Sequence, residues 1–324
     1  MVKAIVIRKT GGPEVMEYVD VEVGDPGPGE VRIRHAACGL NFIDIYFRIG
    51  LYPQPLPGGL GQEASGVIEA IGPGVVGFKA GDRVAYAGRP NGAYSEARVM
   101  PAAILVKLPD AISFDTAAAA MLQGLTVEYL FGRTIPLKGG ETILFHAAAG
   151  GVGLIAAQWA RALGVTMIGT VSSDEKGALA LAAGCTHVIN SKTENIVERV
   201  KEITHGKGVP AVFDSIGKDT FIDSLDCLSP LGTMVSFGSA SGPVPPFSLN
   251  ELVSRGSLYI TRPSLPNYVS TRADLDAASA NLFEMIASKK VNIEINQRYA
   301  LKDVAQAHAD LEARKTTGST ILIP

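Results

Sequence analysis

The 324-residue sequence has few cysteines and lacks both a long apolar run and a secretory leader pattern. Its three cysteines, Cys38, Cys185 and Cys227, are odd in number and far apart, which excludes a disulfide framework or a four-cysteine zinc lobe and fits a reducing compartment. No apolar stretch reaches about 18 residues without a charge, so we expect no membrane-spanning helix. The segment Met1–Ile7 lacks a cleavage site, and we therefore expect a soluble, cytoplasmic protein.

The sequence also lacks any run of basic residues. Its 29 Lys and Arg and 32 Asp and Glu give a formal net charge of −3, and the two signs are interspersed along the chain. This distribution argues against a nucleic-acid groove or a contact with an anionic membrane, and it favours a small-molecule partner. With 47% hydrophobic and 19% charged residues the chain is globular, and its length favours two domains.

The first 110 residues predict a β-rich domain. Short strand-like runs are separated by Gly/Pro turns such as Pro26–Gly29 and Pro55–Gly59. The predicted strands are Val31–Arg34, Ala64–Ile71, Asp82–Ala87 and Tyr94–Val99. Short strands at this spacing indicate a sandwich or a barrel-like domain.

The pattern changes after Asp110. Ser113 is a candidate N-cap for one long helix that runs through Ala117–Ala120 towards Phe131. Strands and helices then alternate, which predicts a parallel, doubly wound sheet with right-handed crossovers. The predicted strands are Thr142–Ala147, Val165–Val171, His187–Asn190, Ala211–Ser215 and Thr233–Phe237, and the predicted helices are Gly151–Leu163, Asp174–Ala183, Glu194–His205 and Asp219–Leu228.

The last 60 residues return to a mixed pattern. Helices are predicted around Leu275–Ala287 and Val304–Arg314, followed by a final strand at Thr320–Ile323. We expect this segment to rejoin the first domain, which gives an α/β fold overall.

The sharpest local signal is a glycine-rich turn between a predicted strand and a predicted helix. Gly150 and Gly151 would let the backbone approach a pyrophosphate at the helix N-terminus, and Gly153 would let the helix pack closely on the strand. Ala148 stands at the first glycine of the G-x-G-x-x-G pattern. A tight turn without a ligand is the alternative, but the strands on both sides favour dinucleotide binding.

The end of the next strand predicts which dinucleotide binds. Ser172 lies 19 residues beyond Gly153, where an NAD site would place a carboxylate on the ribose hydroxyls. A serine there would donate a hydrogen bond to the 2′-phosphate of NADPH, and Lys176 nearby would supply positive charge, although Asp174 and Glu175 are neighbours. The alternative is a helix cap with a solvated first turn.

Several stretches together resemble the zinc-free quinone oxidoreductases, relatives of zeta-crystallin within the medium-chain dehydrogenase/reductase superfamily. These stretches are Ala37–Tyr46, Gly61–Gly66, His146–Gly153, Val235–Gly238, Gly256–Pro263 and Leu301–Asp303. The resemblance covers essentially the whole chain. It implies a GroES-like β-rich catalytic domain at residues 1–122, to which 263–324 return, and a Rossmann NADPH-binding domain with a doubly wound parallel sheet at 123–262.

The resemblance also predicts that no zinc is bound. Asn41 and Gln62 occupy the positions of the catalytic Cys and His ligands in the zinc-dependent alcohol dehydrogenases of this superfamily, and a third Cys would fall near Leu122. Residues 83–100 contain no cysteine, so the structural zinc loop is absent as well. Catalytic zinc needs about three protein ligands, and we therefore expect a metal-free enzyme.

By resemblance, three residues would be catalytic and most of the remaining candidates would contact NADPH. The catalytic candidates are Asn41, Tyr46 and Tyr52, which together with Ile43 would line the nicotinamide end. The other cofactor-binding candidates are Thr126, Gly150, Gly151, Val152, Ser172, Lys176, Asn190, Phe237, Ser239, Arg262 and Arg314. Relatives often carry Tyr where Asn190 stands. The alternative interpretation makes Tyr46 and Tyr52 half-buried core aromatics, and Asn41 and Gln62 structural hydrogen-bonding replacements.

The predicted function is the NADPH-dependent reduction of quinones, by hydride or by successive one-electron transfer. Without zinc to polarise a carbonyl, the acceptor must already be electrophilic, and the enzyme mainly aligns it with the nicotinamide. The alternatives are an NADPH-dependent alkenal/enone reductase and a cofactor-stabilised RNA-binding or structural protein, although the charge pattern argues against a nucleic-acid partner. By resemblance we expect a homodimer formed through strand edges near Thr233–Gly238 and Ser257–Thr261.

Overall fold

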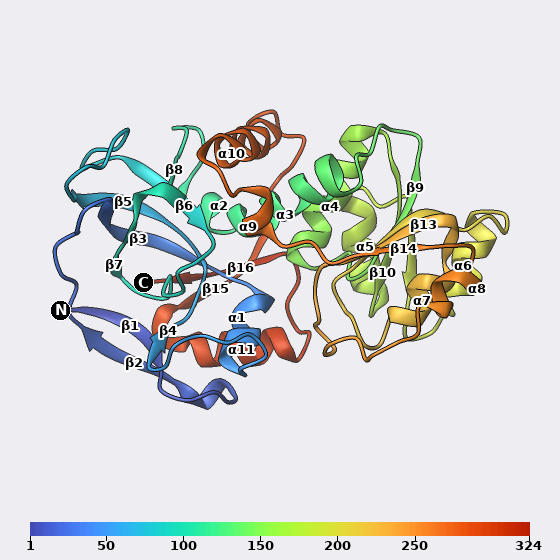
Figure 1. Ribbon diagram of the computed structural model, residues 1–324, viewed down its shortest axis with the longest axis horizontal. Coiled ribbons are helices and arrows are strands. Elements are labelled where there is room, and N and C mark those ends of the chain that lie inside the picture. The colour runs from blue at the N-terminus through green and yellow to red at the C-terminus, as the bar shows by residue number, and fades with distance from the viewer. The chain divides into compact units, whose positions relative to one another are not determined.

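The computed structural model describes all residues from 1 to 324, and the chain forms two compact units (Figure 1). The first unit comprises Met1–Leu125, Tyr268–Ser288 and Ile293–Pro324. The second unit comprises Thr126–Asn267 and Lys289–Asn292. The two ends of the chain, blue and red in Figure 1, therefore belong to the same unit. None of the helices has both the length and the apolar content needed to span a bilayer.

The first unit is built on β-sheets. Its larger, seven-stranded sheet has the strand order β15-β16-β3-β5-β6-β8, with β7 also paired to β3, and a three-stranded sheet has the order β2-β1-β4. The strands are β1 (Val2–Ile7), β2 (Met16–Val21), β3 (Glu30–Leu40), β4 (Gly58–Gly59), β5 (Glu63–Ile71), β6 (Arg83–Ala87), β7 (Ala97–Pro101), β8 (Val106–Lys107), β15 (Ile295–Ala300) and β16 (Ser319–Ile323). The prediction of a β-rich N-terminal region is confirmed.

The end of the chain also lies in the first unit. β16 pairs antiparallel with β3, so that Leu322 lies opposite Cys38. Along β3 the buried residues Val31 and Ile33 alternate with Arg32 and Arg34, whose side chains bind Glu69 on β5. This alternation buries one face of the strand in the core and leaves charge on the other.

The second unit carries a six-stranded parallel sheet with helices between its strands. The strand order is β11-β10-β9-β12-β13-β14, as a doubly wound sheet requires. The strands are β9 (Thr142–Phe145), β10 (Thr166–Val171), β11 (His187–Asn190), β12 (Val209–Asp214), β13 (Leu228–Ser236) and β14 (Tyr259–Thr261). The connecting helices are α4 (Gly151–Leu163), α5 (Asp174–Ala183), α6 (Ile196–Ile203) and α7 (Phe221–Asp226). The predicted Rossmann-type architecture is confirmed.

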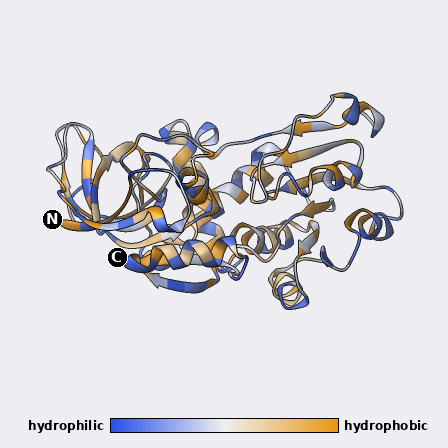
Figure 2. Ribbon diagram, turned by 90° about the horizontal axis from the view of Figure 1, so that it is seen from below, coloured by the Kyte–Doolittle hydropathy of each residue, from blue (hydrophilic) through white to orange (hydrophobic).

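The remaining elements are short segments and the helices of the first unit. They are η1 (Pro13–Val15), α1 (Phe42–Arg48), η2 (Ala102–Ile104), α8 (Asn250–Ser254), α9 (Leu265–Tyr268), α10 (Arg272–Ala287), η4 (Leu301–Asp303) and α11 (Val304–Glu312). Figure 2 shows apolar and polar residues alternating along the longer helices, as expected of helices that bury one face.

One predicted element is wrong in form. The single helix predicted from Ser113 towards Phe131 is divided into α2 (Phe114–Ala118), α3 (Met121–Tyr129) and a π-helical turn, η3 (Leu130–Thr134). Ser113 does cap α2, since its hydroxyl accepts a hydrogen bond from the Thr116 N–H. At the break, Ser319 donates to the Ala119 carbonyl, and the Glu63 carboxylate accepts the Leu122 N–H. Side chains distant in sequence thus replace the backbone partners of a continuous helix, which helix propensity could not reveal.

Candidate active site

The first-unit part of the candidate site is centred on the N-terminus of α1. Asn41 is the N-cap residue, and its backbone N–H donates to Asp44 Oδ2 over 2.9 Å. The Asp44 carboxylate therefore satisfies a donor that helix geometry leaves without an internal partner. Because α1 starts at this point, it fixes the direction in which Ile43 and Tyr46 project.

The Asn41 carboxamide is held on both sides by buried polar groups. Its Nδ2 donates to Glu63 Oε2 over 2.6 Å, and its Oδ1 accepts from Gln123 Nε2 over 3.2 Å. Gln123 Oε1 in turn lies 2.8 Å from the Ser319 hydroxyl, whose single hydrogen is shared between this oxygen and the Ala119 carbonyl. These two bonds make Asn41 Nδ2 the donor towards Glu63 and Oδ1 the acceptor from Gln123. The amide is therefore orientated in advance of any ligand.

Two buried carboxyl groups support this arrangement. Burial raises the pKa of Glu63 from 4.5 to about 8, against the opposing effect of its hydrogen bonds from Asn41 and Leu122. Burial likewise raises the pKa of Asp44 from 3.8 to about 7, although Tyr94 and the Asn41 backbone stabilise its charge. Both groups thus titrate near neutral pH. Both also bind their neighbours, Glu63 the Asn41 amide and Asp44 the Asn41 N–H, and so orientate the residues around them.

A buried hydrogen-bond chain ties α1 to α11. Arg48 NH1 donates to His308 Nδ1 over 2.9 Å, and a guanidinium can only donate, so the His308 proton resides on Nε2. Nε2 lies 3.3 Å from the Tyr94 hydroxyl, which donates to Asp44 Oδ2 over 2.7 Å. Burial and the Arg48 charge lower the pKa of His308 to about 3, so the ring is neutral. At the far end, Arg48 NH2 pairs with Glu312 over 2.7 Å.

The structure brings four of the candidate residues, Asn41, Ile43, Tyr46 and Tyr52, into one local cluster. The Tyr46 and Tyr52 rings meet edge to face with centroids 5.2 Å apart, and the Tyr52 N–H donates to the Tyr46 carbonyl over 3.1 Å. Tyr46 is buried and Tyr52 half-buried, and Ile43 and Tyr52 pack against the core of the first unit. The rings therefore also contribute to core packing, as the alternative interpretation held.

Arg314 is an exposed residue just after α11 with a left-handed φ of 58°.

The second-unit part of the candidate site is the glycine-rich turn between β9 and α4. Ala147 adopts φ 56°, Gly150 is the N-cap of α4, and no side chain caps the helix. A Cβ at Gly153 would lie 2.4 Å from the Ala147 carbonyl oxygen, so this position accepts glycine only. The uncapped N–H groups and the helix dipole form an anion-binding end of the kind that a pyrophosphate requires. The turn therefore fits the predicted dinucleotide.

A second buried hydrogen-bond network fixes this turn. Asp214 accepts from the Ser224 hydroxyl over 2.8 Å, and Ser224 therefore accepts from His146 Nε2 over 3.0 Å. His146 Nδ1 then accepts from Thr170, 3.0 Å away. Burial lowers the pKa of His146, which keeps the ring neutral. His146 is thus a histidine at the end of β9 whose two ring nitrogens both have hydrogen-bond partners.

The end of β10 carries the residues predicted to select the dinucleotide. Ser172 and Lys176 are half-buried, and Ser173 caps α5 by accepting the Lys176 N–H. Asn190 Nδ2 donates to Asp174 Oδ1 over 2.8 Å, which engages the carboxylate closest in sequence to Ser172. The Asn190 side chain therefore joins the end of β11 to the start of α5 through this hydrogen bond.

A third group of candidates gathers at the ends of β13 and β14. Arg262 donates to the Ser236 hydroxyl over 2.9 Å, to the Gly238 carbonyl over 2.6 Å and to the Ser239 hydroxyl over 3.1 Å. The Phe237 ring lies 5.6 Å from the Phe145 ring at the end of β9. Phe237 and Arg262 are thereby placed at the carboxyl edge of the parallel sheet, where ligands bind in such folds. Thr126 is a buried residue of α3.

At the three positions that hold zinc ligands in the zinc-dependent relatives, Asn41 and Gln62 bind other neighbours. Gln62 Nε2 donates to Asn91 Oδ1 over 2.7 Å, the Asn41 amide is engaged by Glu63 and Gln123, and Leu122 has no ligating atom. The chain gathers no three His, Cys, Asp or Glu side chains that could hold a metal ion.

Sequence reasoning missed four residues that position the α1 cluster: Gln123, Tyr94, Arg48 and His308. Arg48 and His308 are 260 residues apart, so no local pattern could pair them. The one available signal was Arg48, which directly follows the largely apolar segment Phe42–Phe47 in the sequence. In the structure its side chain is fully buried. Buried arginines need partners, and that requirement could have prompted a search for them.

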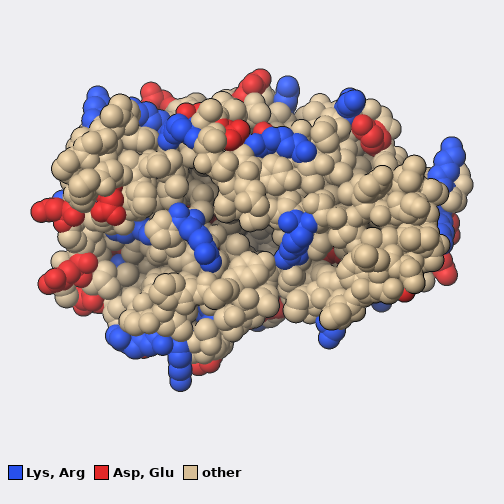
Figure 3. Space-filling view, viewed as in Figure 1, with Lys and Arg blue, Asp and Glu red and all other residues tan.

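The surface charge agrees with the sequence analysis. Figure 3 shows basic and acidic side chains scattered over one face, with no continuous basic stripe on it.

Comparison with known proteins gives matches over the full length. The family model described as "Alcohol dehydrogenase GroES-like domain" matches residues 27–110, and that described as "Zinc-binding dehydrogenase" matches 151–280. A quinone oxidoreductase of Pseudomonas aeruginosa is 56% identical over 100% of both chains, and a 2-haloacrylate reductase of a Burkholderia species is 46% identical over 100% of this chain and 99% of its own. The crystal structure of Escherichia coli quinone oxidoreductase complexed with NADPH matches 99% of this chain and 100% of its own with a TM-score of 0.98 at 51% identity.

Proposed function

The chain belongs to the quinone oxidoreductase family of the medium-chain dehydrogenases/reductases, and we propose that it reduces quinones with NADPH. The observation that carries this proposal is the pair of amides at the metal-ligand positions, Asn41 bound to Glu63 and Gln62 bound to Asn91, in a chain whose α4 begins at a glycine-rich turn without a side-chain cap. A site without a Lewis acid suits an acceptor that is already electrophilic. The reaction converts quinone, NADPH and one proton into hydroquinone and NADP⁺.

The residues of the second unit fit NADPH. Gly150, Gly151 and Val152 would bind the pyrophosphate through their N–H groups, because the α4 N-terminus has no side-chain cap. Ser172 would donate to the 2′-phosphate, and Lys176 would supply positive charge. Because Asp174 is engaged by Asn190, its carboxylate is drawn towards β11 and into a hydrogen bond. When bound, NADPH supplies the hydride.

The nicotinamide end would be held by the remaining candidates. Phe237, Ser239 and Arg262 would border the nicotinamide and its ribose, with Thr126 as a further contact. Arg262 is preorganised for this role by its three hydrogen bonds at the sheet edge. Arg314 would add charge at the phosphate end. Preorganised contacts of this kind reduce the cost of aligning two reactants.

The first unit would hold the acceptor. The Asn41 amide, fixed by Glu63 and Gln123, would orientate a quinone oxygen, while Tyr46 and Tyr52 would pack against its ring. A buried, rigid amide stabilises developing charge better than a mobile one, because it does not have to reorientate during the reaction. These residues are therefore assigned to positioning, and none is assigned to a covalent step.

The test is the oxidation of NADPH and NADH, compared side by side, against a small para-quinone in the presence of a strong chelator. We expect chelator-resistant turnover with a preference for NADPH. Tight NADPH binding without quinone turnover would retain the cofactor assignment and overturn the substrate assignment. Asn41→Ala is expected to lower kcat/KM about tenfold or more, since one charge-stabilising donor is typically worth that much.

The 46% identity to a 2-haloacrylate reductase supports a second candidate, the reduction of activated alkenes. The same metal-free alignment would serve an alkene conjugated to a carbonyl or carboxylate, because such an alkene is electrophilic without a metal. The kcat/KM values for a para-quinone and for an unsaturated aldehyde, measured on one preparation with NADPH, separate the two candidates. A higher value for the aldehyde would favour the second.

We also propose a homodimer formed through the second unit. β14 is an edge strand paired only with β13, and exposed apolar side chains lie on this strand and near it in sequence. Tyr259, Leu249 and Val253 are 60%, 73% and 68% exposed. An open edge with an apolar surround needs covering. Sedimentation velocity should show a dimer that Val253→Asp dissociates. Leu181→Asp, at an exposed site on α5, is the control and should leave the dimer intact. A monomeric unmodified protein would overturn this proposal.

A further inference from the structure

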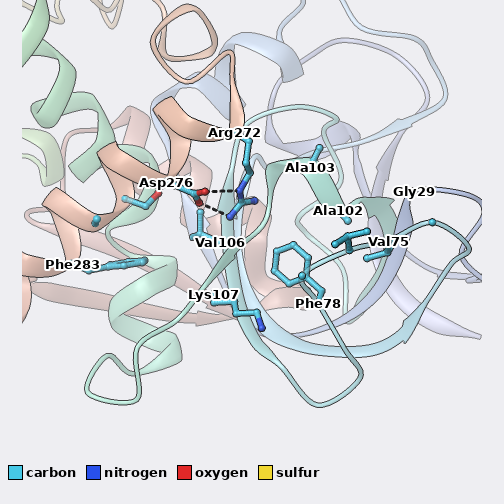
Figure 4. A pocket seen from close by; sticks show the side chains of 15 residues that line it. Gly29, Val75, Phe78, Ala102, Ala103, Val106, Lys107, Arg272, Asp276 and Phe283 are labelled. Atoms are coloured by element: carbon cyan, nitrogen blue, oxygen red, sulfur yellow. Dashed lines mark hydrogen bonds and ion pairs between the residues drawn. The ribbon is translucent and has the colours of Figure 1, made fainter.

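The first unit contains a cavity of about 680 Å³ that none of the candidate active-site residues lines. It lies between α10, β8, η2 and the loop from Gly74 to Phe78 (Figure 4). Its volume falls in the range of small-molecule sites. The proposed reaction makes no use of it.

A buried polar atom without a partner lines this cavity. Ser279 on α10 is 3% exposed, and its hydroxyl has no hydrogen-bond partner in the protein. A helical serine ordinarily donates to the carbonyl four residues earlier, which would be that of Leu275. Leaving a buried hydroxyl unpaired costs about 1–3 kcal/mol. A ligand in the cavity would supply the missing partner.

Positive charge gathers around one aromatic ring at the cavity wall. The Arg272 guanidinium lies 5.7 Å and the Lys107 ammonium 5.8 Å from the centroid of the Phe78 ring (Figure 4). Arg272 is anchored, because its Nε donates to Asp276 over 2.9 Å and its NH1 to the Leu105 carbonyl over 2.6 Å. Each of the two cations has a carboxylate partner, Asp276 for Arg272 and Asp82 for Lys107.

Lys107 retains the capacity to bind an anion. Its Nζ pairs with Asp82 over 2.9 Å, yet its side chain is 55% exposed and an ammonium has three donors. The rest of the lining is largely apolar and includes Val75, Val106 and Phe283. Such a wall suits a flat or aliphatic body, because apolar surface leaves water on binding.

We propose that this cavity is a binding site for a small amphipathic anion. The apolar body of the ligand lies against Phe78 and Phe283, its acidic group lies at Lys107, and a polar atom accepts a hydrogen bond from the Ser279 hydroxyl. The proposal concerns a site other than the one assigned to NADPH and quinone, so its failure leaves the proposed function untouched.

The first test uses anilinonaphthalene sulfonate, a fluorescent aromatic anion, titrated into the full chain in the presence of saturating NADPH. Ala280 lines the cavity on the exposed side of α10, and Ala277 is exposed on the same helix but does not line it. Ala280→Trp is expected to fill the cavity and weaken binding about tenfold or more, a loss of about 1.4 kcal/mol. Ala277→Trp is expected to leave the affinity unchanged. Saturable binding that Ala280→Trp does not weaken, or no saturable binding, overturns the proposal.

The second test probes the two polar contacts. Ser279→Ala and Lys107→Gln are each expected to weaken binding of the same probe about threefold to tenfold. Added salt should reduce the affinity of the unmodified protein more than that of Lys107→Gln. Lys207→Gln, an exposed lysine of the second unit, is the matched control and should behave as the unmodified protein does. An equal effect of the Lys107 and Lys207 substitutions would contradict an anion site at Lys107.

Discussion

Tyr94 donates its hydroxyl hydrogen to Asp44 over 2.7 Å, and this bond joins the core of the first unit to the first turn of α1. Asp44 also accepts the Asn41 N–H, so the same carboxylate binds both the buried Tyr94 and the start of α1. Asp44 Oδ1 is buried without a partner, which leaves Oδ2 to carry both bonds. The orientation of Asn41 and Tyr46 therefore depends on one carboxylate oxygen.

Tyr94→Phe removes the hydroxyl and leaves Asp44 with one donor fewer in a fully buried place. We expect the free energy of unfolding to fall by about 1–3 kcal/mol and kcat/KM for quinone to fall with it, because the start of α1 loosens. Urea unfolding and steady-state kinetics measure the two effects. Tyr299→Phe is the matched control, since Tyr299 donates to the carboxylate of Asp310 at a more exposed site. A loss for Tyr94→Phe no larger than for Tyr299→Phe would contradict this role.

Glu63→Gln is expected to change the pH dependence of stability. The pKa of Glu63 is raised from 4.5 to about 8, so in this window the folded chain keeps a proton that the unfolded chain has released. Stability therefore falls as the pH rises from about 4.5 to about 8, by about 1 kcal/mol for each pH unit. Glu63→Gln cannot titrate and should show a flatter profile in urea unfolding at about pH 5.5 and about pH 7.5. Equal slopes for the two proteins would show that Glu63 does not hold this proton.

The same substitution should also disturb Asn41. A glutamine amide at position 63 places a donor against Asn41 Nδ2 or against the Leu122 N–H, both of which are donors. One buried group then loses its partner. We expect kcat for quinone to fall about tenfold while the Kd for NADPH changes little, because the candidates for the pyrophosphate and the 2′-phosphate, such as Gly150 and Ser172, belong to the second unit. A raised Kd with unchanged kcat would be inconsistent with this assignment.

Gly153→Ala tests the nucleotide turn. The added Cβ would lie 2.4 Å from the Ala147 carbonyl oxygen and 2.6 Å from Ala148, so the backbone must shift. We expect a loss of about 2 kcal/mol in the free energy of unfolding and about a tenfold weaker Kd for NADPH by isothermal titration. Gly177→Ala on α5 is the control, because its Cβ would meet Val188 at an ordinary 3.5 Å. That substitution should stabilise the protein by about 0.5–1 kcal/mol.

Ser172→Asp and Lys176→Ala test the choice of dinucleotide. A carboxylate at position 172 would repel a 2′-phosphate and accept ribose hydroxyls, so KM for NADPH should rise about tenfold or more and KM for NADH should fall. Lys176→Ala should raise KM for NADPH alone. Lys201→Ala, an exposed lysine on α6, should change neither value. Unchanged NADPH preference in Ser172→Asp would place the 2′-phosphate elsewhere.

The sequence determined the architecture because its signals are local. Alternation of apolar and polar residues along Val31–Arg34 predicted a strand, and β3 is found there. The run Gly151–Leu163 predicted a helix with those bounds, and α4 has them. The turn residues Gly150 and Gly153 were also predicted, because a dinucleotide turn demands glycine for steric reasons that hold in any chain.

The same signals failed where partners come from distant parts of the chain. The predicted long helix after Ser113 is interrupted because Ser319 and Glu63 bind backbone groups near residue 120. Helix propensity describes neighbours about four residues apart, and it contains no information about these side chains.

The sequence by itself therefore determined the two folds and the glycine-rich turn, which depend on residue type and short-range spacing. The resemblance to a known family marked Asn41 and Gln62 as replacements of zinc ligands. Only the tertiary structure decided how Asn41 is held, by Glu63 and Gln123, and how His308 reaches Asp44 through Tyr94. The physical reason is that burial makes an unpaired polar group costly, so each one must find a partner, but burial does not specify where along the chain that partner lies.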